Sequence, residues 1–333
     1  MKTIKYPICN SNEFVKFRNL FDDRYGKPNI YVISKCLCCS HLITNPRIKS
    51  EDLPNLYKNF YPRKNLTCKS ILEEAEKEQA RFSEIFRWLK GASNQGQFYV
   101  KKNQSMLDIG CGSGLSLIEA ANQAAYAYGI EADPNIRNIA KKLNLEIFIG
   151  ELDEFTFKNK KFDLRVINQV IEHIQEQNNF LKVVKNKMSK KSSLIISFPN
   201  TKSFWRFISR EKWMNWHVLY NLHHFNANNF IRMVNKCGFR IIKQNTITPN
   251  ISTLMQIRTY LQKRKVGQKS KLWITDTKTK GNMKLNKNTK FLPFYSKIII
   301  KFFIEFIIII INRIIDMICK GDSLVFFLKP EES

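Results

Sequence analysis

A glycine-rich turn in residues 105–114, SMLDIGCGSG, is the stretch of the sequence best suited to bind a small-molecule cofactor. We expect a short strand before the turn and a helix after it, with Gly110, Gly112 and Gly114 in the turn itself. Glycine tolerates positive φ and lets backbone amides approach a ligand closely, and the N-terminus of the following helix attracts electron-rich groups. The pattern is therefore typical of a nucleotide-binding strand–turn–helix unit.

An acidic residue, Glu131, ends the next expected strand, about twenty residues after the turn. In dinucleotide-type folds an acid at this position binds the ribose hydroxyl pair, so we predict that Glu131 binds a ribose. The alternative is a charge at a helix N-terminus. Asp133 fits that role better, because it directly precedes Pro134.

Two candidate catalytic residues, Glu172 and His173, lie in the segment QVIEHI, residues 169–174, which follows the fourth expected strand. A histidine at that place could remove the proton of an acceptor hydroxyl near neutral pH. The alternative for His173 is a capping or packing role. The sequence leaves both interpretations open.

Three cysteines near the N-terminus, Cys9, Cys36 and Cys39, have the spacing of a degenerate zinc ribbon. Cys36 and Cys39 form a Cys-x-x-Cys knuckle, and a structural zinc site needs four ligands. Tyr6 stands where a fourth cysteine is expected, so Cys38 or His41 would have to substitute. The ribbon could also have lost its metal and hold buried free thiols.

An aromatic-rich segment, residues 200–225, follows the fifth expected strand. Long connections at the carboxyl end of a strand often shape a pocket, so we interpret this segment as a substrate lid. Four of its side chains are candidate acceptor contacts: Trp213, Trp216, His223 and His224. The alternative is that they only cover the sheet.

The elements that must position these groups alternate between short apolar strands and helix-length segments, which favours a parallel sheet with helices on both faces. The expected strands span residues 106–109, 126–130, 145–149, 162–167, 193–198, 239–248 and 321–330. Ligands in such sheets bind at the carboxyl ends of the strands. The glycine turn, Glu131 and the QVIEHI segment all follow strands, so we expect them at one edge.

Four segments, DIGCGSG, GIEADP, KFDLRVINQVIEHI and ISFPN, resemble in order and spacing the class I S-adenosylmethionine-dependent methyltransferases. The resemblance is strongest to the group related to ubiquinone-pathway O-methyltransferases and to methyltransferases of surface-glycan gene clusters. The glycines are spaced Gly-x-Gly-x-Gly, whereas dinucleotide-dependent dehydrogenases have Gly-x-Gly-x-x-Gly.

The resemblance implies S-adenosylmethionine as the cofactor and assigns several residues to it. Its amino-acid half would contact Asp108, Gly110, Gly112 and Gly114. Its adenine would lie near Glu151 and Leu152, and Asn168 would approach the methyl-donating face. In this sequence Gln169 replaces the first acid of a metal-binding Glu-x-x-Glu-His found in some relatives. Asn221 stands where relatives often have histidine, a role that His223 and His224 could take over.

Pattern and resemblance together predict an α/β fold with a Rossmann-like, seven-stranded, mostly parallel sheet and a small N-terminal cysteine-containing module. The expected activity is O-methylation of a sugar, a glycan intermediate or another small or lipid-linked molecule. The alternatives are a non-catalytic methyltransferase-like scaffold and an RNA methyltransferase.

The chain is strongly basic, with 55 Lys and Arg against 28 Asp and Glu and a net charge of +27. The lysines are scattered and no aromatic-basic RNA motif accompanies them, so a nucleic-acid partner is disfavoured. A phosphorylated substrate or an anionic membrane fits the charge better. No secretory apolar segment is visible, so we expect a cytoplasmic chain without a disulfide framework.

The expected domains are an N-terminal module (1–60), a connecting segment with an amphipathic helix over 70–90 (61–100), and a cofactor-binding domain (101–250 with 321–333). The remaining residues, 251–320, form an insertion, flexible over 250–290 and helical over 296–320. That helix has a very wide apolar face, but its charges leave too short an uncharged run to span a bilayer. It could pack on the domain, form a homodimer, or lie on a membrane. Its mixed charge signs favour packing.

Overall fold

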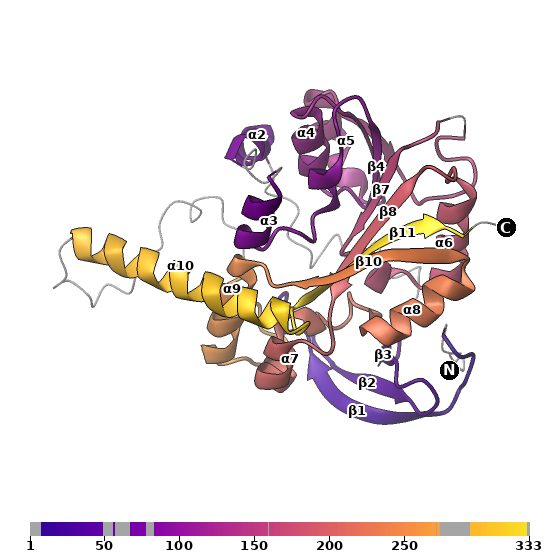
Figure 1. Cartoon of the computed structure of the whole chain (residues 1–333). Helices are drawn as coiled ribbons and strands as arrows, with labels where there is room; N and C mark the ends of the chain where they lie inside the picture. The colour runs from indigo at the N-terminus through magenta and orange to yellow at the C-terminus, as the bar shows by residue number, and fades with distance from the viewer. Residues whose placement is uncertain are drawn as a thin grey trace.

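A seven-stranded sheet forms the centre of the computed structural model, which describes residues 8–48, 56, 67–77, 83–158, 160–270, 272–273 and 294–331 (Figure 1). Its strands are β4 (Ser105–Ile109), β5 (Tyr126–Glu131), β6 (Glu146–Ile149), β7 (Leu164–Asn168), β8 (Ser193–Pro199), β10 (Phe239–Ile247) and β11 (Ser323–Pro330). The order is β10-β11-β8-β7-β4-β5-β6. Strands β6, β5, β4, β7 and β8 pair in parallel, and β11 lies antiparallel between β8 and β10. The predicted Rossmann-like fold is confirmed.

Helices cover both faces of this sheet because its strands are apolar on both sides. Adjacent residues of β4 join different cores: Met106 packs in one buried cluster and Leu107 in the other. Successive side chains of a strand point to opposite faces, so each cluster marks one face. Helix α4 contributes Leu117 to the first cluster, whereas α6 contributes Leu181 and α8 contributes Phe230 to the second.

The α-helices are α2 (Cys68–Lys77), α3 (Glu84–Lys90), α4 (Leu115–Ala121), α5 (Arg137–Lys142), α6 (Gln177–Asn186), α7 (Phe204–Ser209), α8 (Ala227–Lys236), α9 (Asn250–Leu261) and α10 (Phe294–Met317). Short 3₁₀ turns are η4 (Gly96–Tyr99), η5 (Pro134–Ile136), η6 (Ile171–His173), η7 (Arg210–Lys212) and η8 (Met214–Trp216).

A second, antiparallel sheet combines the N-terminal segment with a strand from the lid segment. It contains β1 (Phe14–Phe21), β2 (Ile30–Cys36), β3 (Leu42–Asn45) and β9 (His223–His224), in that order. Strand β9 pairs with β3 through Leu42 and Ile43. The N-terminal sheet is therefore completed by residues that lie about 180 positions later in the chain.

Two local expectations were wrong. The helix expected over 70–90 is two helices, α2 and α3, because Ser83 before α3 has an extended backbone (φ −68°, ψ 130°). Residues 78–82 lie outside the described part of the chain, and α3 ends at Gly91, whose φ is +72°. The flexible segment expected from residue 250 begins instead with helix α9, whose Thr253 and Gln256 are buried. Residues 274–293 lie outside the described part of the chain.

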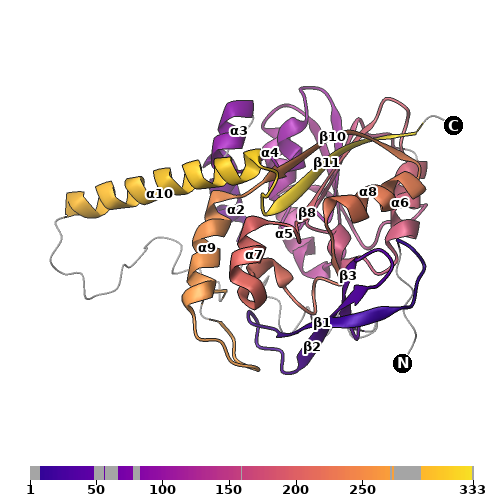
Figure 2. The ribbon, with the colours of Figure 1, turned by 60° about the horizontal axis from the view of Figure 1, so that its bottom comes forward.

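Helix α10 forms where a helix was expected and extends away from the body of the molecule in both views (Figures 1 and 2). Within the described residues, no helix combines the length and apolarity needed to cross a bilayer.

Candidate functional site

The carboxyl edge of the parallel strands brings together the residues that the sequence singled out for cofactor binding. Asp108 in β4 pairs with Gly129 in β5 and with Val166 in β7. Glu131 ends β5 and Asn168 ends β7, on either side of β4. Because these strands are parallel and in register, all three side chains belong to the same edge of the sheet.

The three glycines of the turn have different surroundings. A Cβ on Gly110 would lie 2.4 Å from Val170, and one on Gly114 would lie 2.5 Å from Leu145, so both positions are closed by packing. A Cβ on Gly112 would meet nothing within 4 Å. All three have φ between +59° and +82°, a region that favours glycine. The turn therefore presents its backbone at Gly112 to open space, which fits a ligand lying against it.

Asp108 is a buried carboxylate, and one of its two oxygens lacks a hydrogen-bond partner in the described part of the chain. Ser116 Oγ donates to Oδ2, whereas Oδ1 has no hydrogen-bond partner among the described residues. Burial raises the pKa of Asp108 to about 6, and the Ser116 bond opposes that shift. A cationic ligand group at Oδ1 would stabilise the ionised form, which fits the amino group of an amino-acid ligand.

Glu131 is held by backbone amides next to the turn. The Gly112 N–H donates to its Oε2 at 2.8 Å and the Asp133 N–H donates to its Oε1 at 3.0 Å. A carboxylate oxygen can accept more than one hydrogen bond, so both oxygens can also receive ribose hydroxyls. The Asp133 side chain accepts from Asn135 N and caps the following 3₁₀ turn η5, as expected.

Asn168 belongs to a polar group that the sequence did not indicate in full. Ser197 Oγ lies 2.5 Å from Asn168 Oδ1 and 2.7 Å from the carbonyl oxygen of Asn94. The Asn94 side chain is buried, and its Oδ1 has no hydrogen-bond partner within the described residues. Asn94 precedes the sheet by more than ten residues, so no strand pattern could identify it.

His173 lies in η6 with its ring oriented by the lid segment. Its Nδ1 is 2.8 Å from the carbonyl oxygen of Tyr220. A carbonyl can only accept, so Nδ1 carries the hydrogen and the basic lone pair is on Nε2. This tautomer suits a general base.

The side chain of Glu172, the residue before His173, is buried. It is 2% exposed, and its Oε2 has no hydrogen-bond partner in the described part of the chain. Burial raises its pKa to about 8, so the carboxyl group is mostly protonated at neutral pH. The backbone carbonyl oxygen of Glu172 accepts a hydrogen bond from the Leu222 N–H, which connects η6 to the lid segment.

His217 is a second histidine near His173 that the sequence prediction missed. Its ring stacks on Tyr220 with 4.5 Å between centroids, and its φ is +35°. Burial lowers its pKa well below the usual value, with further contributions from Arg24 and His173. The sequence shows that His217 lies within the aromatic segment 200–225. It cannot show that His217 lies near His173, because that proximity depends on the tertiary structure.

The predicted lid tryptophans are buried in a core shared with the N-terminal sheet. Trp213 is 1% exposed and packs edge-on against Trp216, with 5.3 Å between ring centroids. Trp213 Nε1 donates to Asp322 Oδ1 at 2.8 Å and Trp216 Nε1 donates to the Arg210 carbonyl at 2.7 Å. Both rings join Leu20 and other residues of the N-terminal sheet in one cluster. Their role as acceptor contacts stays a prediction.

His223 and His224 form β9 and bond to β2–β3 residues. His41 Nε2 lies 3.1 Å from His223 Nδ1, and Thr44 Oγ1 lies 3.0 Å from His224 Nε2. Burial lowers the pKa of His224 to about 3 and that of His223 well below the usual value, so both are neutral. Their observed contacts connect the lid segment to the N-terminal sheet, and contact with an acceptor stays a prediction.

Glu151 and Leu152 follow β6 at the same edge of the sheet. Glu151 is exposed, and Leu152 is half-buried against the core. Their predicted place beside an adenine ring is compatible with these positions and stays a prediction.

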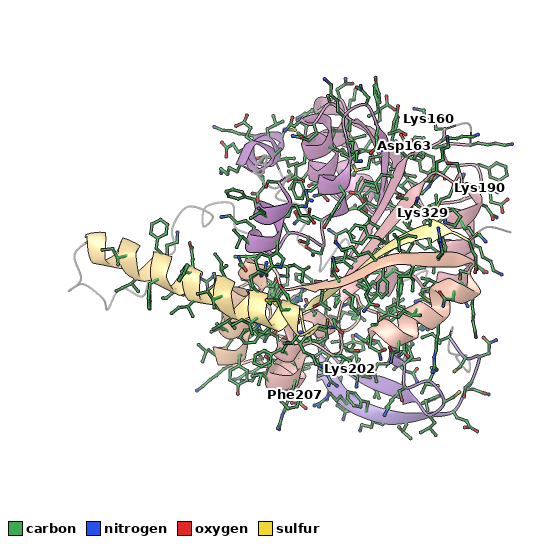
Figure 3. All side chains as sticks on the ribbon, in the orientation of Figure 1. Lys160, Asp163, Lys190, Lys202, Phe207 and Lys329 are labelled. Atoms are coloured by element: carbon green, nitrogen blue, oxygen red, sulfur yellow. The ribbon has the colours of Figure 1, made fainter. Side chains whose placement is uncertain are left out.

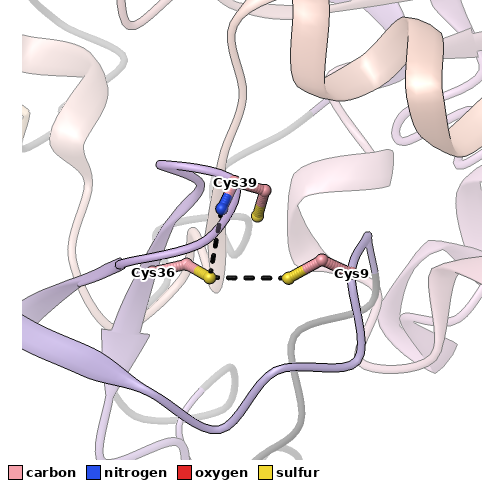
Figure 4. Close-up of side chains that lie close together, drawn as sticks. All are labelled: Cys9, Cys36 and Cys39. Atoms are coloured by element: carbon pink, nitrogen blue, oxygen red, sulfur yellow. Dashed lines mark hydrogen bonds between the residues drawn. The ribbon is translucent and has the colours of Figure 1, made fainter.

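The three predicted metal ligands come together. The sulfur atoms of Cys9, Cys36 and Cys39 all lie within 4.8 Å of one another (Figure 4). Cys9 Sγ and Cys36 Sγ are 3.5 Å apart, and the Cys39 N–H donates to Cys36 Sγ. Burial, followed by the neighbouring thiols, raises the pKa of Cys39 to about 12, whereas a bound cation would favour the thiolate. Two buried thiols, of Cys36 and Cys39, and the half-buried thiol of Cys9 fit a zinc ion.

The fourth ligand does not come from the two alternatives considered. Cys38 is exposed and His41 Nε2 faces His223, so neither joins this group in the described part of the chain. Tyr6 lies outside the described residues.

Comparisons with known proteins agree with this geometry. A family model described as a methyltransferase domain matches residues 77–244, about half of the chain. An uncharacterized protein of Methanocaldococcus jannaschii is 24% identical over 137 residues, which cover 41% of this chain and 65% of that protein. Norajmaline N-methyltransferase of Rauvolfia serpentina is 33% identical over 91 residues, which cover 25% of this chain and 31% of the enzyme. The matched stretches thus span less than two thirds of these relatives.

Solved structures give more distant likenesses. A SAM-dependent methyltransferase from Archaeoglobus fulgidus is 15% identical, with a TM-score of 0.41 over 77% of this chain and 94% of that one. A plantazolicin methyltransferase in complex with SAH is 15% identical, with a TM-score of 0.43 over 84% of this chain and 94% of that one.

Proposed function

The chain belongs to the methyltransferase domain family, and from that premise we propose that it transfers the methyl group of S-adenosylmethionine to an oxygen atom. The proposed acceptor is a sugar, a glycan intermediate or another small or lipid-linked molecule. The observation that carries the proposal is the open side of the turn at Gly112, whose N–H binds Glu131, together with Asp108 Oδ1, which has no hydrogen-bond partner among the described residues.

These residues fit the cofactor part by part. The backbone at Gly112 would lie along the amino-acid half, Asp108 Oδ1 would accept from its ammonium group, and Glu131 would accept from the ribose hydroxyls. When bound there, S-adenosylmethionine supplies a methyl group activated by the adjacent sulfonium. Asn168 ends β7, two residues after Val166, which pairs with Asp108, and this position at the sheet edge suits a contact near that methyl group.

His173 would then accept the proton of the acceptor hydroxyl at Nε2. The Tyr220 carbonyl oxygen fixes the required tautomer through Nδ1. An alcohol needs this help because its hydroxyl is a poor nucleophile until its proton is leaving. The remaining rate enhancement comes from positioning the two reactants in line.

An amine acceptor is the second candidate. It rests on the norajmaline enzyme, whose name specifies methylation at nitrogen. The base at His173 would serve there by removing the proton of an ammonium group.

Label transfer distinguishes these acceptors. The full chain is incubated with S-adenosylmethionine tritiated in the methyl group and with separate lipid, glycan, polar-metabolite and RNA extracts. We expect label in a sugar-containing or lipid-linked product, with an O-methyl linkage identified by fragmentation. Label at nitrogen would support the second candidate, and label in RNA would contradict both.

A matched pair of variants ties the reaction to the site. Asp108→Asn removes the charge next to the turn and should abolish most of the label transfer. Asp163→Asn changes an exposed aspartate at the opposite end of the strands and should leave it unchanged. Equal activity of the two variants would contradict the assignment.

A further inference from the structure

In the second half of helix α10 the polar side chains face the protein, whereas the side chains of Lys301 and Glu305 in the first half are 56% and 45% exposed. Asn312, Arg313 and Asp316 are buried. Asn312 Oδ1 accepts from Thr253 Oγ1 at 2.8 Å, and Asp316 Oδ1 accepts from Thr248 Oγ1 at 2.8 Å. Arg313 pairs with Asp316 at 2.8 Å, so the polar face is occupied within the fold.

The opposite side of α10 is an exposed apolar surface. Its exposed large apolar residues are Ile299, Ile300, Phe302, Phe303, Ile304, Phe306, Ile307, Ile310, Ile311, Ile314 and Met317. At about 100° per residue, they occupy roughly 200° of the helix circumference. A helix that packs on one neighbour needs an apolar stripe of roughly 100°. The exposed arc is therefore about twice what a single partner helix can cover.

Neighbouring helices also carry exposed apolar residues. Helix α10 contacts α3 and α9, and α9 contacts α7 (Figures 1 and 2). Exposed apolar residues on these elements include Ile85 and Phe86 of α3, Tyr260 and Leu261 of α9, and Phe207 and Ile208 of α7. Phe207 points outward at the margin of the molecule (Figure 3). We call the exposed apolar residues of α10, α3, α9 and α7 the outer face.

We propose that the outer face docks on the surface of a lipid bilayer that contains anionic phospholipid. The apolar interior of a bilayer can cover the whole apolar arc of α10, roughly 200°. A second copy of the helix would cover only about half of that arc. Spanning is not needed, and Lys301 and Glu305 within the helix disfavour it.

The exposed charges around α10, rather than the mixed charges on the helix itself, support the same occupant. The chain carries a net charge of +27, and exposed Lys90, Arg258 and Lys320 lie on or directly after the helices of the outer face, with Glu84 as an exposed acid there. Glu305 is paired with Lys301 at 3.8 Å. Basic side chains near an anionic lipid surface add attraction to that of the apolar contact.

The outer face adjoins the edge of the sheet that carries the candidate site. Ser323, six residues after α10, pairs with Pro199 at the carboxyl end of β8 and with Ile247 at the end of β10. The Phe204 N–H donates to the Lys320 carbonyl oxygen, which joins α7 to the end of α10. A bilayer on the outer face would present a lipid-linked acceptor near the site. This last step rests on the proposed function, whereas docking itself does not.

Vesicle flotation of the full chain tests the proposal. Vesicles of phosphatidylcholine with about 30% phosphatidylglycerol are compared with vesicles of phosphatidylcholine alone. We expect binding to the anionic vesicles and at least tenfold weaker binding to the neutral ones. The variant Phe302→Gln with Phe306→Gln should bind the anionic vesicles at least tenfold more weakly. Phe306 is 61% exposed, so circular dichroism and S-adenosylmethionine binding should be unchanged.

Tyr126→Gln is the matched control, because Tyr126 is also 61% exposed but lies at the amino end of β5. It should float with the vesicles like the unaltered chain. Failure of the unaltered chain to float, or equal binding by the double variant, overturns the proposal. So does a dimer in sedimentation velocity that the double variant converts to a monomer without any vesicle binding, since the occupant would then be a second copy.

Discussion

His173 combines a fixed tautomer with a place at the carboxyl edge of the sheet. The Tyr220 carbonyl oxygen holds Nδ1–H, so the ring presents its basic nitrogen in one orientation. The sequence could indicate that a histidine follows the fourth strand, but not that a residue 47 positions later would orient it.

Replacing His173 by asparagine keeps a donor for the Tyr220 carbonyl oxygen and removes the base. We expect kcat for methyl transfer to fall by about 10²- to 10⁴-fold, with little change in the affinity for S-adenosylmethionine. Single-turnover kinetics and calorimetry measure the two quantities. A parallel loss of both would mean that His173 is a packing residue.

Glu172 makes a prediction about stability. Its pKa is raised by burial from 4.5 to about 8, so the folded state keeps its proton over a pH range in which the unfolded chain loses it. Stability contributed by the protonated carboxyl is therefore present below pH 4.5 and is lost as pH rises to about 8. Glu172→Gln should remove this loss of stability with rising pH, because glutamine has no carboxyl proton to lose.

The measurement is urea denaturation of both proteins between pH 5 and pH 8. The variant's free energy of unfolding, relative to that of the unaltered chain, should increase by up to about 1.4 kcal/mol per pH unit as the pH rises. A difference that is constant with pH would contradict the burial of Glu172 in its neutral form.

At the scale of elements, the lid segment is tied to the sheet by Asp322, just before β11. Asp322 accepts from Ser203 Oγ, Trp213 Nε1 and Asn215 Nδ2, each at 2.8 Å. Its carboxylate is the common acceptor for three side chains of the segment. Loss of the carboxylate leaves buried donors without a partner, which is costly.

Asp322→Ala should therefore lower the free energy of unfolding by about 2 to 5 kcal/mol. Glu146→Ala, an exposed acid in β6, should change it by less than about 0.5 kcal/mol. Urea denaturation followed by tryptophan fluorescence compares them. Equal stability of the two variants would show that the lid segment is held by apolar packing alone.

The regular elements could be predicted where one local pattern dominates. The parallel strands are short apolar runs, and Gly110 and Glu131 lie at their ends, so the sheet and its edge follow from periodicity. Strand β9 could not be predicted, because two histidines carry no strand signal and pair only when β3 is already present. Helix α9 has weak amphipathic character, and its buried Thr253 and Gln256 bind partners on α10 and near Met214.

At the scale of the whole molecule, the N-terminal sheet and the lid segment form one apolar core. The thiols of Cys9, Cys36 and Cys39 lie together at the end of β2, whose last residue is Cys36. The prediction of three ligands could be made from spacing alone, whereas the contacts of the N-terminal sheet with His223 and Trp216 could not.

We predict about one zinc ion per chain, bound by these three thiolates and one further ligand. Cys36→Ser should abolish zinc binding and lower the thermal midpoint, because metal-binding free energy contributes to folding. Cys38→Ser, which changes an exposed neighbour, should retain the metal. Elemental analysis of the purified chains measures this, and an equal zinc content in both variants would contradict the site.

The central claim is that the glycine turn with Asp108 and Glu131 binds S-adenosylmethionine. Calorimetric titration of the full chain with this compound tests it most directly. We predict one saturable site per chain, with affinity reduced at least tenfold by Glu131→Gln and lost progressively below pH 6 as Asp108 becomes protonated. A folded chain that shows no binding, or binding that is insensitive to Glu131→Gln, would contradict the claim.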